Sequence, residues 1–149
     1  MANEIERENF LKVVKTIQAR FPKLRTELTT ENLRVIDANF EISAQDGLVF
    51  PFSMNLQHDE LHLHVGNFWC EWFPCGKQEV CDKFIGIVSG LLSGSYRVVE
   101  YWRFGSFLKA HIQKLDEQGW KTIAWSSKLH IPIRWGVSTK ILQNVSPSI

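Results

Sequence analysis

Four short segments between residues 36 and 73 alternate apolar and polar side chains, and this alternation constrains the fold more than any other feature of the sequence. Such alternation is typical of strands with one buried face. The segments span residues 36–42, 50–56, 60–65 and 68–73 and are separated by turn-forming residues, among them Asp46-Gly47 and Gly66-Asn67. Because strands joined by short turns pair antiparallel, this region is expected to form a four-stranded meander. Pro51 cannot donate a ladder hydrogen bond, so the second segment is expected at a sheet edge or bulge.

Helical spacing of apolar residues is found on both sides of the meander. A first helix is expected to follow Asn3, with Glu6 completing a capping box, and to end at Pro22. A second is expected over residues 78–92, and a third from Ser106 to Gly119. Strands are expected over residues 96–104 and 120–125, with an irregular edge over residues 129–137.

These elements predict an α+β fold with the order α-β-β-β-β-α-β-α-β. The expected architecture is a mainly antiparallel, twisted sheet of about six strands with the helices packed on one face. A length of 149 residues, 44% of them hydrophobic and 22% charged, fits one globular domain spanning residues 1–149. No secretory signal or membrane-spanning run is recognised. The odd number of three cysteines favours a reducing compartment, so a cytoplasmic location is expected.

Charge is unevenly distributed along the chain although the net charge is only +1. From Val35 to Gly76 there is no Lys or Arg, while this stretch contains Asp37, Glu41, Asp46, Asp59, Glu60 and Glu71. Aromatic residues gather in its last strand. A negative surface with exposed tryptophans is typical of an interface that attracts a basic protein and then anchors it. The residues predicted to bind such a partner are Glu41, Glu60, Glu71, Trp69 and Trp72.

The general character of the chain resembles the immunity and antitoxin proteins with which bacteria occlude basic toxin domains. The resemblance lies in a small α+β domain with an acidic, tryptophan-bearing sheet and covers no motif. It implies a non-enzymatic interaction module, and a solvated acidic face without a partner is the alternative interpretation of the same charges.

A second hypothesis concerns the histidines of the third strand. Glu60, His62 and His64 project from one face, and two imidazoles two residues apart can chelate one metal. An open-sided site of this kind could hold zinc or iron and support a metal-dependent hydrolase. The alternative is that these histidines belong to an ordinary polar strand face, because no further ligand motif occurs at a recognised spacing.

Two residues are candidates for catalysis. Glu100 shares a strand face with apolar residues, so it is expected either to pair with a group such as His62 or to have a raised pKa, as a general acid would. Cys75 precedes the second helix, whose dipole would lower the thiol pKa, and it could act as a nucleophile. The structural alternatives are a buried hydrogen-bonding carboxylate and an inert thiol.

The sequence is also compatible with two other classes of ligand. A small-molecule pocket could lie between the sheet and the helices, rimmed by tryptophans and Glu100. Basic residues scattered among aromatics in the C-terminal half could contact nucleic acid, but the near-zero net charge disfavours this. Glycine-rich phosphate loops and nucleophile-elbow motifs are absent from the sequence.

Overall fold

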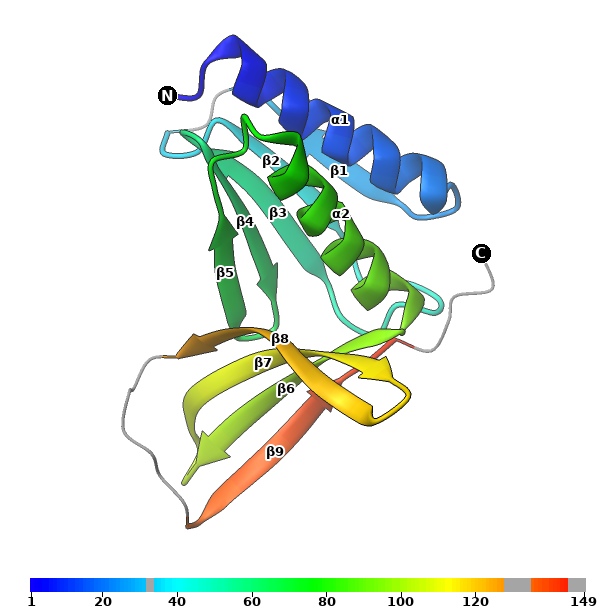
Figure 1. Ribbon diagram of the computed structural model, residues 1–149, viewed down its shortest axis with the longest axis vertical. Coiled ribbons are helices and arrows are strands. Elements are labelled where there is room, and N and C mark those ends of the chain that lie inside the picture. The colour runs from blue at the N-terminus through cyan, green and yellow to red at the C-terminus, as the bar shows by residue number, and fades with distance from the viewer. Residues whose placement is uncertain (32–33, 128–134, 145–149) are drawn as a thin grey trace.

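A computed structural model gives the positions of residues 1–31, 34–127 and 135–144, which form two helices and two antiparallel sheets (Figure 1). The predicted α+β class is therefore confirmed. The expectation of one sheet of about six strands is wrong, because the strands divide into a five-stranded and a four-stranded sheet. The prediction of a single domain over residues 1–149 stays a prediction, because part of that range lies outside the described residues.

The first helix, α1 (Glu4–Arg20), starts where the sequence predicts. The Glu6 amide donates to Asn3 Oδ1 at 3.0 Å, and the Asn3 amide donates to Glu6 Oε2 at 2.6 Å, so the capping box is complete. Phe10, Val13 and Ile17 lie on its buried face. Helical spacing of these side chains thus gives α1 one apolar side, which packs on the larger sheet (Figure 1).

The larger sheet is a meander in which each strand pairs with the next along the chain. Its strands are β1 (Thr26–Thr29), β2 (Ala38–Ile42), β3 (Phe52–Gln57), β4 (Glu60–Val65) and β5 (Phe68–Trp72). The meander predicted from alternation is confirmed for β2 to β5, whereas β1 is an additional edge strand. This strand has only four residues, and three of them are polar, so the sequence shows no alternation of apolar and polar side chains there. Pro51 precedes β3, and β3 lies inside the sheet, so the edge position expected from Pro51 is wrong.

The second helix, α2 (Gln78–Ser93), lies beside α1 on the same face of the larger sheet (Figure 1). Its buried residues include Phe84, Val88 and Leu91, which join the core formed by α1 and the inner side of the sheet. Apolar residues thus fill the layer between sheet and helices. The opposite face of the larger sheet carries neither of the two helices that the structure describes.

The smaller sheet has the strand order β8-β7-β6-β9 and lies across one end of the larger sheet (Figure 1). Its strands are β6 (Tyr96–Arg103), β7 (Ser106–Asp116), β8 (Gly119–Ser127) and β9 (Val137–Leu142). Val98, Ala110 and Ile112 from its inner side belong to the same hydrophobic cluster as the two helices. Of the predicted edge over residues 129–137, residues 129–134 lie outside the described residues.

The predicted third helix is wrong, because residues 106–116 form strand β7. The chain reverses at Phe104 and Gly105, which both have positive φ (48° and 76°), and Arg103 then pairs with Ser106. Two positive-φ residues make the tight turn that suits a two-residue hairpin. Ser106 therefore starts a strand, and the apolar spacing that resembles a helix belongs to a strand with a register shift between Ile112 and Gln113.

Neither helix among the described residues combines the length and apolar character needed to cross a membrane.

Candidate functional site: the polar face of the larger sheet

The pairing register of the larger sheet places its polar side chains on the face opposite the helices. Asn39, Asn55, His62 and Glu71 form one row across β2 to β5, and Glu41, Ser53, His64 and Trp69 form the next. Glu60 lies on the same side, because residues two apart on a strand share a face. This polar face comprises Glu27, Thr29, Asn39, Glu41, Ser53, Asn55, Glu60, His62, His64, Trp69 and Glu71.

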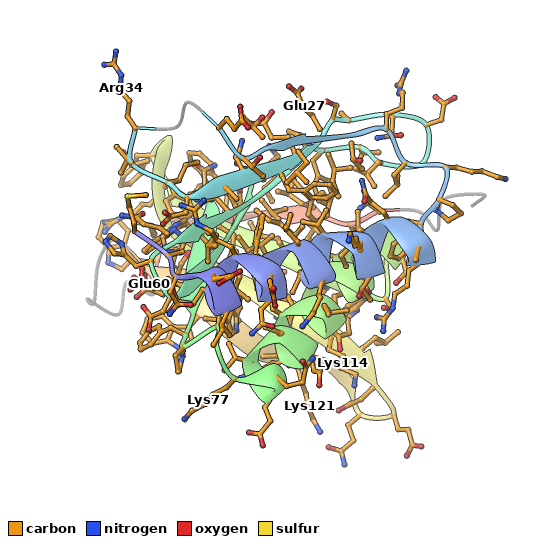
Figure 2. All side chains as sticks on the ribbon, turned by 90° about the horizontal axis from the view of Figure 1, so that it is seen from above. Glu27, Arg34, Glu60, Lys77, Lys114 and Lys121 are labelled. Atoms are coloured by element: carbon orange, nitrogen blue, oxygen red, sulfur yellow. The ribbon has the colours of Figure 1, made fainter. Side chains whose placement is uncertain are left out.

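Negative charge on the polar face has no positive counterpart within its strands. The five strands contain four glutamates and no Lys or Arg. Glu27 and Glu41 are direct cross-strand partners, a like-charge arrangement that destabilises a sheet. The Asn39 amide donates to Glu41 Oε1 at 2.9 Å, which solvates that carboxylate without neutralising it. Lysines gather elsewhere: Lys114 and Lys121 lie on the side of the molecule opposite Glu27 (Figure 2).

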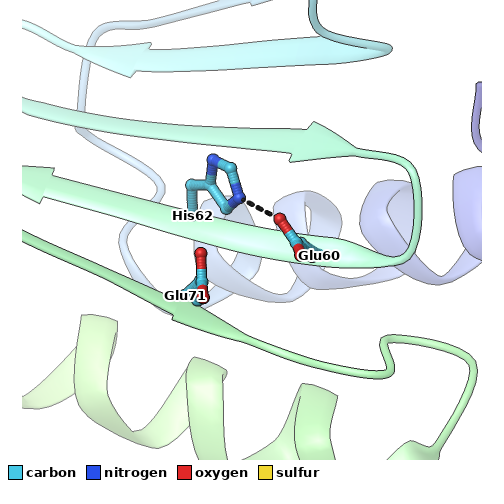
Figure 3. A group of neighbouring side chains, drawn as sticks. All are labelled: Glu60, His62 and Glu71. Carbon is cyan, nitrogen blue, oxygen red and sulfur yellow. Dashed lines mark hydrogen bonds and ion pairs between the residues drawn. The ribbon is translucent and has the colours of Figure 1, made fainter.

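His62 lies between two carboxylates on this face (Figure 3). Its Nε2 atom is 2.9 Å from Glu60 Oε2, and its direct cross-strand partner is Glu71. One ligand atom from each of Glu60, His62 and Glu71 lies within 4.8 Å of the others. Metal–ligand bonds of about 2 Å place two ligands of one ion at most about 4 Å apart, so small side-chain movements would let these three residues hold a divalent ion.

Asn55 adds an oxygen beside this group. It is the cross-strand partner of His62, and the Asn55 side chain is on the same face. Asn55 is only 8% exposed, and its Oδ1 atom has no hydrogen-bond partner among the described residues. A buried acceptor without a donor costs free energy, so a bound ion or water at Oδ1 would relieve that cost.

His64 is not a member of this cluster, although the sequence predicted a His62–His64 pair as metal ligands. Burial lowers the pKa of His64, and the neighbouring His62 lowers it further. The ring centroid of His64 lies 6.2 Å from that of Trp69, and His64 lines a shallow hollow with Glu41 and Ser53. Glu71, which the sequence assigned to partner binding, takes the place of His64 among the possible ligands.

The two tryptophans of β5 have different environments. Trp69 is 43% exposed on the polar face, and its ring centroid is 5.5 Å from that of His62. Trp72 is 9% exposed on the opposite face, with its ring edge-on to Phe84 of α2 at 5.3 Å. The alternation within β5 causes this difference. Trp72 is therefore part of the core rather than a contact for a partner, and the prediction that it binds one is corrected.

Asp37 is not part of the polar face, although the sequence placed it there. Its carboxylate accepts hydrogen bonds from Arg7 at 3.2 Å and from the His58 amide at 2.9 Å. Burial by itself would raise the Asp37 pKa, but the backbone donors and the nearby positive charges hold that pKa below its usual value. Asp37 thus ties α1 to the turn between β3 and β4.

Glu100 is fully buried on the inner side of β6. Its Oε1 atom accepts from the Asn67 amide at 2.7 Å and from Asn67 Nδ2 at 3.2 Å, while Oε2 accepts from Trp102 Nε1 at 3.0 Å. These contacts, rather than the expected one with His62, link the β4–β5 turn to the smaller sheet. Gly66 is required there, because a Cβ atom would lie 2.5 Å from Glu100 Oε1.

Cys75 is fully buried, and the prediction of a lowered thiol pKa is wrong. Burial raises the Cys75 pKa to about 12, with smaller contributions from Glu6, Cys81 and Asp59. The helix dipole does not compensate for the loss of solvation, because α2 begins only at Gln78. A thiol of this kind is rarely ionised near neutral pH and is a poor nucleophile.

The structure therefore brings together Glu41, Glu60, Glu71, Trp69, His62 and His64 of the predicted site residues, and separates Trp72, Glu100 and Cys75 from them. Glu27 and Asn55 were missed. Glu27 lies in a strand without a sequence signal, but the alternation that placed Glu41 and His62 outward could have identified Asn55. No protein-family model, curated protein or solved structure matches this chain.

Proposed function

We propose that this protein is a non-enzymatic interaction module that binds a basic protein partner through the polar face. The observation that carries the proposal is the set of four glutamates on a face whose strands contain no Lys or Arg. A solvated surface selected for stability alone would mix positive and negative side chains. The repulsion between the cross-strand partners Glu27 and Glu41 instead lowers the stability of the sheet. Binding a cationic surface would offset that repulsion.

Trp69 supplies the apolar anchor of the proposed interface. Interface hot spots are enriched in tryptophan, and they lie within polar surroundings that exclude water on binding. Trp69 is exposed on the edge strand β5, two residues from Glu71 and beside His62 and His64. The hollow lined by Glu41, Ser53 and His64 offers a place for a lysine or arginine side chain of the partner. An immunity or antitoxin role belongs to this proposal, with a basic toxin domain as the partner.

Charge reversal tests the proposal with a labelled arginine- and lysine-rich peptide as the probe. Binding measured by fluorescence anisotropy should weaken with added salt, and the triple variant Glu41→Lys, Glu60→Lys, Glu71→Lys should abolish it. Trp69→Ala should weaken binding about tenfold or more. Glu117→Lys, on the exposed turn between β7 and β8, is the matched control and should bind nearly as wild type. Equal affinity of the triple variant and the control, with circular dichroism unchanged, would refute the proposal.

Metal binding is a second candidate function, favoured by the cluster of Glu60, His62 and Glu71 beside the unpartnered Asn55 Oδ1. One imidazole and two carboxylates suit zinc or iron and leave coordination positions open. Titration with Zn²⁺ or Fe²⁺ should give one equivalent bound. His62→Ala should abolish that binding, and His64→Ala should preserve it. Loss of metal in both variants, or no stoichiometric binding by the wild type, would exclude this site.

A further inference from the structure

The smaller sheet also exposes one face, and its composition is opposite to that of the polar face. Val98, Ala110 and Ile112 point into the core, so their neighbours along each strand point outward. We name this outer surface the aromatic face; it comprises Arg97, Val99, Tyr101, Arg103, Lys109, His111, Gln113, Trp120, Thr122, Trp125, Thr139 and Ile141. Trp125 is 58% exposed and Ile141 is 51% exposed, so these side chains are open to solvent, whereas Val99 between them is 6% exposed.

Cations and aromatic rings are interleaved on the aromatic face. The Arg97 guanidinium lies 4.0 Å from the ring centroid of Trp120, and Lys109 Nζ lies 5.0 Å from that of Tyr101. At its edge, the Arg103 guanidinium lies 3.9 Å from the ring centroid of Trp135. A guanidinium stacked on a ring is held in one plane, and its N–H donors remain directed outward at its edge. Such a donor edge matches a phosphate group.

The strands of the smaller sheet place no carboxylate beside these cations on the aromatic face. Strands β6 to β9 contain only Glu100 and Asp116 as acidic residues. Glu100 is buried on the inner side, and Asp116 lies at the end of β7, where its carboxylate is 2.7 Å from Lys121 Nζ. The near-zero net charge of the whole chain therefore does not describe this face. Acidic residues on the larger sheet balance the total, while the aromatic face itself carries three cations.

We propose that the aromatic face binds single-stranded nucleic acid. Phosphates would pair with Arg97, Arg103 and Lys109, and bases would stack chiefly on the exposed ring of Trp125 and secondarily on the half-buried ring of Tyr101. An acidic protein would match the cations alone, whereas interleaved cations and aromatic rings match a strand that offers phosphates and unpaired bases together. Stacking accepts any base, so the sequence preference should be weak.

The test uses fluorescein-labelled oligo-dT and oligo-U of about 12 nucleotides, a length within the usual site size of such surfaces. Anisotropy should show binding at low salt that weakens as salt is added, with intrinsic tryptophan fluorescence quenched at saturation. Trp125→Ala should weaken binding about tenfold or more. Arg97→Ala combined with Lys109→Ala should lower the slope of log affinity against log salt by about 1.4, roughly 0.7 for each lost phosphate contact.

Two matched controls change side chains outside the aromatic face, although the Trp69 amide itself donates to Ser126 Oγ of β8 at 3.4 Å. Trp69→Ala removes the exposed tryptophan of the polar face, and Lys77→Ala removes a lysine at the start of α2; both should bind the oligonucleotides as wild type does. The basic-peptide experiment above is independent of this one, so either proposal can fail alone.

Four outcomes would overturn the proposal. The first is no oligonucleotide binding at low salt, and the second is equal weakening by Trp69→Ala and Trp125→Ala. The third is that poly-glutamate binds as tightly as oligo-dT and that Trp125→Ala does not weaken this binding. Such a result would assign the aromatic face to an acidic protein partner. The fourth is salt-sensitive self-association in sedimentation velocity that both Glu41→Lys and Lys109→Ala abolish. That result would assign the aromatic face to the polar face of a second copy.

Discussion

The two sheets are both antiparallel and both bury one side in a shared core, yet their exposed sides carry opposite charge. The larger sheet presents glutamates, histidines and one tryptophan, while the smaller presents arginines, a lysine and several aromatic rings. Folding requires only that the inner sides be apolar. Both proposed binding functions rest on the contrast between the outer sides, which the net charge of +1 conceals.

Binding is proposed for the exposed sides of the sheets, and a purely structural role for the buried groups. A reactive Cys75 would contradict this division. At about pH 8, Cys75 should react with iodoacetamide roughly a thousandfold more slowly in the folded protein than in urea, because a pKa of about 12 leaves little thiolate. Peptide mapping by mass spectrometry gives both rates. Cys70 is only half-buried and is the internal control, which should be modified first. Rapid modification of Cys75 in the folded state would contradict its assignment as inert.

Glu100 tests how firmly the two sheets are joined. Glu100→Ala should lower the free energy of unfolding by about 3 kcal/mol, because the Asn67 amide and Trp102 Nε1 lose a charged acceptor inside the protein. Urea denaturation followed by circular dichroism measures this loss. Glu117→Ala, at an exposed turn, should change stability by less than about 0.5 kcal/mol. A loss below about 1 kcal/mol for Glu100→Ala would mean that the contact between the sheets is weak.

Acidification should move the two proposed binding activities in opposite directions. Burial lowers the pKa of His64 on the polar face and of His111 on the aromatic face, with His62 and Lys109 as the respective smaller causes. Both rings are therefore neutral at pH 7 and gain charge below about pH 6.5. Lowering the pH from about 7.5 to about 5.5 should weaken binding of the basic peptide and strengthen binding of oligo-dT, each by a few-fold.

The same shifts predict a stability change. A histidine whose folded pKa is depressed contributes stability that is fully present above the unfolded pKa of about 6.5 and is lost as the pH falls through that window. His64→Gln and His111→Gln should each reduce this acid sensitivity in urea titrations. Each should also reduce the pH dependence of binding at its own face only. Parallel pH effects at both faces would show that the faces are not independent.

The smallest expected effect concerns the glutamate pair at the edge of the larger sheet. Glu27→Lys replaces a like-charge cross-strand pair with an opposite-charge pair and should raise the free energy of unfolding by about 0.5 kcal/mol. It should also weaken binding of the basic peptide. Glu117→Lys, on the exposed turn between β7 and β8, is the control, because it makes the same charge change away from the Glu27–Glu41 pair. A stabilised variant with unchanged peptide affinity would place Glu27 outside the interface.

Local periodicity predicted much of this fold and of the candidate site. The capping box of α1, the four strands of the meander and α2 follow from side-chain spacing within each segment. Alternation also predicted that Glu41, Glu60, His62 and His64 share one face, because residues two apart on a strand point the same way. It failed for residues 106–116, where the spacing of Phe107, Leu108, Ile112 and Leu115 fits a helix as well as an irregular strand. Pairing with β6 and β8 decided between them.

The sequence by itself determined which side chains alternate and where the acidic stretch lies. Only the tertiary structure decided which side of β5 and of the strands of the smaller sheet is buried. This choice placed Trp72 against Phe84, buried Glu100 beside the β4–β5 turn and left the aromatic face on the outside. The physical reason is that alternation fixes the relative direction of neighbouring side chains, whereas burial depends on contacts between segments far apart in the chain. Desolvation depends on those same contacts, and for Cys75 it outweighed the effect of the nearby helix.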